Sequence, residues 1–483
     1  MIAGYCWPQS GKAGEVVSLH LHSDHGPVDV AVVRVGAREA HIAGWTNVIA
    51  PVQPMPENAA LTGCDWPATL QIRIENDWQT GFYRVDIRSG ERSGEAFFVV
   101  KAQDNTQVDA VLVLATSTWA AYNDWGGPSY YTGGTVCALK RPLPRGFLKK
   151  DDPRKQRCGL FIDWTEEDQV SFRKAGYSGW SLPAGWAGWE QLFVEWAETQ
   201  GLSLAYGVSQ DLIFDDSLLD GVSLYLSVGH DEYWSGEMRD RIEAFIDEGG
   251  NAAFFSGNTC FWQARYDDDR WVSYKMDIEA DPVFDENGAC DLATMWSDPL
   301  IGRPENEMTG VSFTRGGYAH MANSPRGTGG YHVWRPDHWA FTGVELAEHE
   351  DLGARQTVVA YECDGCAFEM RDGLPVPTGI DGTPLNMQIL ASAPARLWET
   401  HQLPDNLRDD YVGELNWVSQ RIGGDDNEEN RAIYGDGHAV MGMFKRGRGE
   451  VFTTGCTDWA YGLVDPKVSR VTLNIINRFL DTS

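Results

Sequence analysis

Residues 222–258 place the strongest constraint on the fold of this chain. The apolar run Val222–Val228 is followed by a helical pattern that begins near Ser235, and a second apolar run covers Ala252–Phe255. This order of strand, polar turn, helix and strand predicts a βαβ unit with two parallel strands. Units of this kind build doubly wound α/β layers, so we expect a mostly parallel sheet in this part of the chain.

Polar residues follow both predicted strands at the same end. His230, Asp231 and Glu232 come directly after the first strand, and Asn258 follows the second. Ligands and reacting groups in open parallel sheets collect at the carboxyl ends of the strands. We therefore expect these side chains to line an active-site rim, with Asp231 serving as a carboxylate at the entry to the helix.

The first hundred residues follow a different pattern, in which short alternating segments are separated by turn residues. These segments lie at Val16–Leu21, Val28–Val35, Ala68–Ile74, Gly81–Ile87 and Ala96–Lys101. Period-two patterning at this spacing predicts an immunoglobulin-like β-sandwich over residues 1–102.

From residue 108 onward, apolar runs alternate with helical patterns, which predicts an α/β domain over residues 108–483. The first run of this part is Ala110–Ala115. The C-terminal part of this predicted α/β domain is irregular and β-rich. We expect strands at Gln356–Tyr361, Gln388–Ala391, Ala439–Phe444 and Gly449–Thr454 and a closing helix at Val468–Leu480.

Composition excludes several classes of partner. A formal net charge of −31 argues against nucleic acid and anionic membrane surfaces. No apolar run approaches the length of a membrane span, and the first residues lack the basic and apolar regions of a signal peptide. Nine scattered cysteines suit a reducing compartment, so we expect a cytoplasmic protein. Twenty tryptophans are compatible with a homo-oligomer.

A second polar segment follows the first predicted strand of the α/β domain and carries Tyr122, Tyr130 and Tyr131. Tyrosines in such a loop can simply pack as amphipathic side chains. Alternatively, their hydroxyls face the same cavity as Glu232. A phenol has an ordinary pKa of about 10, and a hard trivalent cation would remove its proton. Two phenolates and one carboxylate would then balance the charge of Fe³⁺.

Several segments of the chain together resemble the N,N-dimethylformamidase large (beta) subunit family. The likeness runs over most of residues 108–483 and is carried, in order, by Trp119–Asn123, Gly126–Tyr131, Gly229–Trp234, Phe255–Asn258 and Gly302–Asn306. The resemblance implies an amidohydrolase on a glutamine-amidotransferase-like α/β fold. It also implies a mononuclear Fe³⁺ held by two tyrosines and one glutamate.

The resemblance assigns the metal ligands by motif position. Tyr122 matches the first tyrosine, Tyr131 the second and Glu232 the carboxylate, while the adjacent Tyr130 is an alternative to Tyr131. This chain is much shorter than the family's large subunit. The identity of the amide and the need for a small partner subunit therefore stay open.

The resemblance also matches His230 and Asn258 to residues of the family's site. From the demands of amide hydrolysis, we expect His230 to transfer protons and Asn258 to form a hydrogen bond with the water or with the tetrahedral oxygen. The predicted function is hydrolysis of the C–N bond of small N-substituted amides such as formamides. One alternative is a non-catalytic module that binds a carbohydrate or a protein on the same fold. Another is a cysteine-dependent amidotransferase-like enzyme that uses Cys260. A nucleophilic thiol belongs in the strand-to-helix elbow, where this chain has Asp231 and Glu232, and this disfavours the thiol mechanism.

Overall fold

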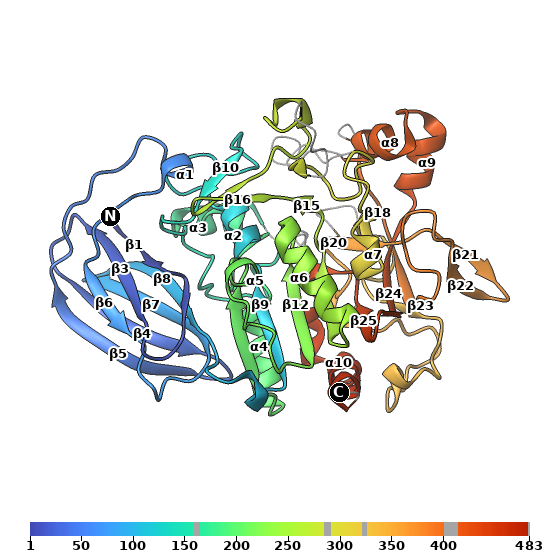
Figure 1. The fold of residues 1–483 in the computed structure, drawn as a ribbon, viewed down its shortest axis with the longest axis horizontal. Coiled ribbons are helices and arrows are strands. Elements are labelled where there is room, and N and C mark those ends of the chain that lie inside the picture. Colours follow the sequence, from blue (N-terminus) through green and yellow to red (C-terminus); the bar gives the residue numbers. More distant parts are fainter. Residues whose placement is uncertain (159–164, 285–290, 321–325, 400–413, 482–483) are drawn as a thin grey trace. The chain divides into compact units, whose positions relative to one another are not determined.

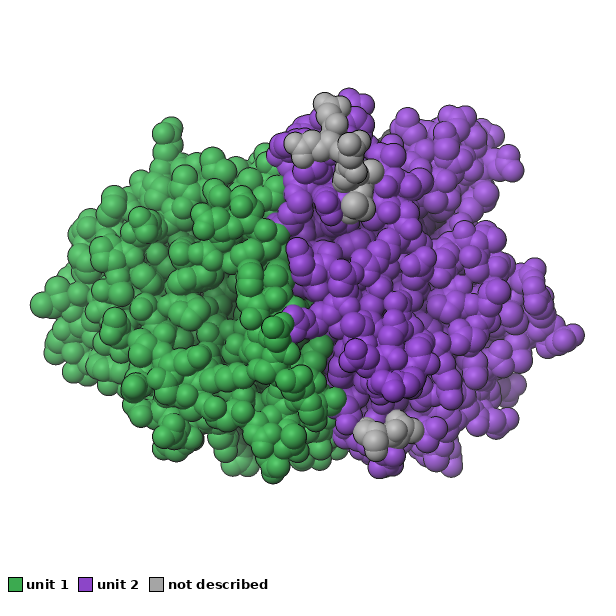
Figure 2. Space-filling model, in the orientation of Figure 1, with its two compact units in different colours: residues 1–156, 166–222, 266–272 green, residues 157–165, 223–265, 273–483 purple. Residues whose placement is uncertain are grey.

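The computed structural model describes residues 1–158, 165–284, 291–320, 326–399 and 414–481. It is a mixed α/β structure with a large, mostly parallel sheet and a small antiparallel β region near the N-terminus (Figure 1). Two compact units, distinguished in Figure 2, comprise residues 1–156, 166–222 and 266–272 (unit 1) and residues 157–165, 223–265 and 273–483 (unit 2). The domain limits at 1–102 and 108–483 remain a prediction.

The antiparallel region of unit 1 consists of two small sheets that share one apolar core. The first sheet has the order β1 (Ile2–Trp7), β3 (Val16–Ser23), β6 (Leu70–Arg73), and the second has the order β2 (Ser10–Gly11), β8 (Arg92–Val100), β7 (Gly81–Ser89), β4 (Val28–Val35), β5 (Glu39–Val48). Leu19 and Leu21 of β3 and Val85 and Ile87 of β7 belong to the shared core. The alternating pattern predicted every strand here except β1, β2 and β5. Among these, β5 has no buried residue and β1 is buried at successive positions, so neither shows the period-two signal.

Unit 1 also contains the parallel strands β9 (Ala110–Leu114) and β11 (Leu204–Val208). Both strands are entirely buried, as expected for strands covered on both faces. The segment after β9 was expected to be a loop, and this is wrong, because Thr116–Tyr122 forms the buried helix α2. No glycine or proline precedes Gly126 in this segment, so nothing prevents the helix from continuing to Tyr122.

In unit 2 the sheet has the order β12 (Leu224–His230), β14 (Asn251–Gly257), β25 (Gly449–Thr453), β24 (Gly437–Arg446), β23 (Gln388–Ala395), β19 (His332–Val333). The first three strands are parallel and the later ones are antiparallel. Helix α6 (Gly236–Asp247) connects β12 to β14, which confirms the predicted βαβ unit (Figure 1). Ser235 caps this helix by accepting a hydrogen bond from the backbone N–H of Met238.

The strand predicted over Gln356–Tyr361 is wrong. The apolar residues of this run are buried, but the backbone N–H of Val359 donates to the carbonyl of Gly329 rather than to a strand ladder. The strand begins just afterwards as β20 (Glu362–Gly365), which pairs antiparallel with β18 (Ser312–Tyr318). The apolar run therefore marks burial, while the ladder forms at the polar residues that follow it.

The remaining elements are mostly short. They are α1 (Ala59–Thr62), β10 (Val136–Ala138), α3 (Glu166–Lys174), α4 (Glu190–Thr199), α5 (Asp211–Phe214), β13 (Tyr233–Trp234), β15 (Trp262–Gln263), β16 (Arg265–Asp267), β17 (Arg270–Val272), α7 (Asn306–Thr309), β21 (Phe368–Arg371), β22 (Leu374–Pro377), α8 (Leu415–Gly423), α9 (Glu428–Gly435) and α10 (Pro466–Asp481). Helix α10 packs against β12 and β14. Within the described parts of the chain, we find no helix with the length and apolar character that crossing a bilayer requires.

A buried carboxyl group in unit 2 should make the stability of the fold depend on pH. Glu305 accepts a hydrogen bond from Ser297 Oγ at 2.6 Å and another from the hydroxyl of Ser312. Burial outweighs these bonds and raises the pKa of Glu305 from 4.5 to about 7. Because the folded pKa lies above the unfolded one, the stabilisation linked to this proton is complete below pH 4.5 and disappears as the pH rises through about 7.

The Glu305→Gln variant removes this titrating group while retaining a similar shape. We expect the free energy of unfolding of the variant, relative to wild type, to increase between about pH 4.5 and about pH 8. Urea unfolding of both proteins across this range measures the difference. A difference that stays constant with pH would contradict the raised pKa.

Candidate functional site

The sheet of unit 2 brings three of the predicted site residues to one edge. Strand β12 ends at His230, which is in register with Gly257 at the end of the neighbouring strand β14. Glu232 follows β12 by two residues, and Asn258 is the first residue after β14. The side chains of all three are buried. The carboxyl ends of these parallel strands therefore position His230, Glu232 and Asn258 together, as the sequence predicts.

His230 lies between two carboxylates. Its Nε2 is 2.7 Å from Glu362 Oε2 and 3.3 Å from Glu232 Oε2. The His230 side chain is inaccessible to solvent, and those of Glu232 and Glu362 are only 3% and 5% exposed. Charges that are shielded from water interact strongly, so this histidine can hold or release a proton under the direct influence of both glutamates.

Asn258 connects the same glutamate to the end of β14. Its Nδ2 donates a hydrogen bond to Glu362 Oε2 at 3.1 Å, whereas its Oδ1 is buried and has no hydrogen-bond partner within the described residues. Gly257 makes this closeness possible, since a Cβ at this position would lie 2.6 Å from the backbone oxygen of Glu362. A buried acceptor without a donor is uncommon in folded proteins, which marks Asn258 Oδ1 as a place where a water or a ligand can bind.

The backbone around Asn258 is held by a second carboxyl group. The N–H groups of Asn258 and Thr259 donate to the two oxygens of Asp364, at 2.9 and 3.1 Å. Burial raises the pKa of Asp364 to about 8, even though both hydrogen bonds act to lower it. Asn258 has a positive φ of 49°, a conformation that asparagine tolerates better than most residues.

Glu362 and Asp364 were missed in the sequence. Both lie on β20, directly after the apolar run over residues 358–361. This is the same signal that identified His230 and Glu232, namely an apolar run that ends in acidic side chains. The signal was overlooked because the strand was placed on the apolar run itself.

Asp231 does not have the predicted role at the helix entry. Its carboxylate accepts hydrogen bonds from Ser227 Oγ at 2.7 Å and from Trp234 Nε1 at 2.9 Å, while Ser235 caps the helix. Burial raises the pKa of Asp231 to about 6. Asp231 therefore stabilises the turn between β12 and α6 through buried hydrogen bonds.

Two of the predicted tyrosines meet in unit 1. Tyr122, at the end of α2, stacks on Tyr131 with ring centroids 4.2 Å apart and an interplanar angle of 19°. Trp180 packs on the ring of Tyr131, at 5.4 Å between centroids. The structure thus places two phenols side by side, one of them on a helix rather than on the expected loop.

Tyr130, the alternative to Tyr131, faces elsewhere. Its phenol interacts with the thiol of Cys137, and its backbone N–H bonds to Ala121. Tyr131, by contrast, stacks directly on Tyr122. Geometry within unit 1 therefore favours Tyr131 over Tyr130 as the partner of Tyr122.

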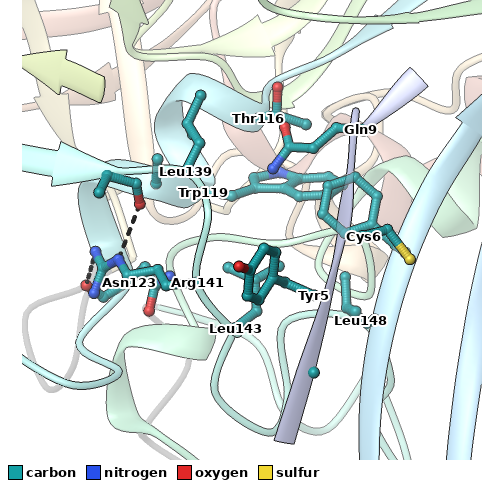
Figure 3. A pocket seen from close by; sticks show the side chains of 15 residues that line it. Tyr5, Cys6, Gln9, Thr116, Trp119, Asn123, Leu139, Arg141, Leu143 and Leu148 are labelled. Carbon is teal, nitrogen blue, oxygen red and sulfur yellow. Dashed lines mark hydrogen bonds between the residues drawn. The ribbon is translucent and has the colours of Figure 1, made fainter. Parts of the chain in front are cut away.

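A buried arginine holds the segment that follows Tyr122. Arg141, drawn beside Asn123 in Figure 3, donates to the backbone oxygens of Asn123 (2.9 Å) and Ala138 (3.0 Å). It also donates to the backbone oxygen of Trp125 (2.5 Å), and burial lowers its pKa. It lines a cavity of about 20 Å³ together with Trp119. One water needs on the order of 10–15 Å³, so this cavity is too small for an N-alkyl amide.

The predicted ligands are distributed over both units, with Tyr122 and Tyr131 in unit 1 and Glu232 in unit 2. That the two tyrosines and Glu232 meet at one metal ion remains a prediction. Across the described residues, no group of three or more His, Cys, Asp or Glu side chains has the geometry to hold a metal ion. Cys260 is buried and its pKa is raised well above the ordinary value, so its thiol stays protonated and is a poor nucleophile.

Comparison with known proteins gives one extensive match. The sequence model of a family described as N,N-dimethylformamidase beta subunit-like, C-terminal, matches residues 29–470, which include most of the N-terminal β region. No curated protein matches the chain. Among solved structures, the sulfur carrier protein SoxY from Chlorobium limicola f thiosulfatophilum is 17% identical with a TM-score of 0.13, over 21% of this chain and 79% of its own. A likeness this slight supports no argument about fold or function.

The family match covers far more than half of the sequence and includes every residue assigned to the site. The chain therefore belongs to the N,N-dimethylformamidase beta subunit-like family.

Proposed function

We propose that the protein is an amidohydrolase that cleaves the C–N bond of small N-substituted amides such as formamides. Membership of the N,N-dimethylformamidase beta subunit-like family suggests an amidase. The observation that carries the proposal is the buried cluster in which His230 Nε2 lies 2.7 Å from Glu362 and Asn258 donates to the same carboxylate. Hydrolysis needs groups that accept and return protons away from bulk water, and this cluster supplies them.

The donor set suits a ferric ion, and we assign Tyr122, Tyr131 and Glu232 as the residues that hold one mononuclear Fe³⁺. Two phenolates and one carboxylate neutralise a trivalent charge, and hard oxygen donors match iron(III) better than zinc or copper. The stacked pair of Tyr122 and Tyr131 and the buried carboxylate of Glu232 support the assignment from each unit separately. When bound, the ion supplies Lewis acidity that polarises an amide carbonyl.

The other side chains of the cluster accept protons and orient the water. A proton taken from the attacking water is stabilised by the His230–Glu362 pair, since the imidazole and the carboxylate are in contact. One N–H of Asn258 Nδ2 donates to Glu362, and the buried Oδ1 is an acceptor without a partner among the described residues. An acceptor suits the O–H of a water rather than an anionic oxygen. We therefore assign Asn258 to orienting the water, the first of its two predicted roles.

We also propose the finer fold assignments. The α/β layer is doubly wound and glutamine-amidotransferase-like, supported by the β12–α6–β14 unit. The N-terminal β region is an immunoglobulin-like sandwich, supported by the single core that its two sheets share. The described cysteines are free and buried, which favours the reducing cytoplasm. A homo-oligomer and a small partner subunit are further candidates for its assembly.

Release of amine from an amide panel tests the proposal. The purified protein, reconstituted with Fe³⁺, is incubated with formamide, N-methylformamide, N,N-dimethylformamide and formanilide, and each amine is quantified. We expect turnover of at least one N-substituted amide and a visible colour from iron–phenolate charge transfer. A colourless protein that binds no iron and releases no amine would instead support the binding module with no catalytic role.

A further inference from the structure

A further carboxyl group, that of the half-buried Glu414, belongs to the cluster around Glu362. Strands β18 and β20 place Tyr318 directly opposite Glu362 in their antiparallel register. The hydroxyl of Tyr318 donates to Glu414 Oε1 at 3.2 Å. Tyr361 completes the group, with ring centroids 6.0 Å from Tyr318 and 5.6 Å from His230. Glu414 therefore lies in the same part of unit 2 as the proton-handling residues.

The hydrogen bonds of Glu414 indicate where its proton resides. Because Tyr318 donates to Oε1, that oxygen acts as the acceptor, and the acidic proton is left on Oε2. Oε2 is buried and has no hydrogen-bond partner within the described residues. The protonated carboxyl group of Glu414 is therefore a hydrogen-bond donor without an acceptor among the described residues.

The charges that face Glu414 keep it neutral. Burial raises its pKa to about 8, and the negative charge of Glu362 adds to this effect. Tyr318 and the ammonium of Lys275 act in the opposite direction but are weaker. Glu362, by contrast, accepts a hydrogen bond from Asn258 and lies against His230. The two carboxyl groups therefore have different partners, a phenol for Glu414 and an imidazole for Glu362.

We propose that Glu414 is the acid that donates a proton to the nitrogen of the departing amine. This inference rests on the proposed amide hydrolysis. It completes that reaction, since the His230–Glu362 pair accepts a proton but the leaving nitrogen also needs one.

The atoms balance with water as the only co-reactant. The water oxygen bonds to the carbonyl carbon, and its proton goes to the His230–Glu362 pair. The C–N bond then breaks with its electron pair on nitrogen, which takes the proton from Glu414 Oε2. The proton held by His230 and Glu362 returns to Glu414. One amide and one water thus become one carboxylic acid and one amine, with the protein restored.

A comparison of amides with different leaving groups distinguishes a proton donor from a residue with a structural role. Dimethylamine is strongly basic and must be protonated to leave, whereas aniline departs more readily. For Glu414→Gln, we expect kcat on N,N-dimethylformamide to fall about 10²- to 10⁴-fold. The loss on formanilide should be much smaller, and the iron content should be unchanged. Glu305→Gln, which also replaces a glutamic acid whose pKa is raised by burial, is the matched control and should lower neither rate.

An infrared measurement on the iron-free protein gives a second readout. Protonated buried carboxyl groups give a carbonyl band at about pH 7, to which Glu414 and Asp364, both with a pKa of about 8, contribute. In Glu414→Gln this band should lose the part that belongs to Glu414, and the difference between the two proteins should disappear as the pH rises past about 8. Tyr318→Phe keeps the carboxyl group but removes the donor to Oε1. If Glu414→Gln fails to fold, a selective loss of N,N-dimethylformamide turnover in Tyr318→Phe carries the test.

The two hypotheses fail differently. A wild-type protein that hydrolyses no amide overturns the proposed function. A wild-type protein that hydrolyses N,N-dimethylformamide, together with a Glu414→Gln variant of equal kcat, overturns only the role of Glu414. Equal losses on both amides also overturn it, because they indicate a general disturbance rather than a missing acid.

Discussion

The Glu362→Gln variant is expected to hydrolyse amides about 10²- to 10⁴-fold more slowly than wild type, the usual contribution of general acid–base catalysis. Glu362 Oε2 contacts both His230 Nε2 and Asn258 Nδ2. Glutamine keeps the shape and one oxygen, but it removes the negative charge that stabilises a proton on His230. Steady-state kinetics should show the loss in kcat, with a much smaller change in KM.

Glu305→Gln is the matched control for this experiment. It makes the same chemical change at a buried glutamate whose carboxylate bonds to Ser297 and Ser312 instead of His230. Its kcat should remain close to that of wild type. A Glu362→Gln variant with the kcat of Glu305→Gln would show that the contact with His230 has no part in the chemistry.

Tyr122→Phe and Glu232→Gln should each lose bound iron and activity together. Each substitution removes one negative oxygen donor from the proposed set, leaving two ligands and an unbalanced charge on the ion. Metal analysis after dialysis gives the iron content, and visible absorption reports the phenolate charge transfer. The colour should vanish in Tyr122→Phe and in Glu232→Gln.

Tyr130→Phe is the control, because the phenol of Tyr130 interacts with Cys137, whereas Tyr131 stacks on Tyr122. It should keep the colour and the iron, and Tyr131→Phe should lose both. Full iron retention in both Tyr122→Phe and Glu232→Gln would refute the ligand assignment. Colour that is lost in Tyr130→Phe but kept in Tyr131→Phe would move the second ligand to Tyr130.

Much of the fold follows from local patterns. The apolar runs that became β9, β12 and β14 are strands buried along their whole length, and the helix between β12 and β14 has a clear start at Ser235. Residues at the ends of such strands are therefore predictable, which is why His230, Glu232 and Asn258 could be named. Strand β5 has no buried residue, and so its sequence carries no periodic signal.

The rest of the site depends on distant segments that no local pattern links. Glu362 meets His230 from a strand more than a hundred residues along the chain, after an apolar run that resembles a strand but bonds elsewhere. Glu414 is connected to the cluster through its hydrogen bond with Tyr318. Acidic residues in irregular regions are usually solvated, so burial in the folded chain is the feature that distinguishes these two.

The close approach at Gly257 limits how this protein can be altered. Even a methyl group there would collide with the backbone of Thr457, Cys456 and Glu362, so the segments that pack around Asn258 would have to move apart. A directed-evolution library that seeks new amide substrates should therefore keep glycine at 257 and diversify aromatic positions such as Tyr361, whose ring contacts His230.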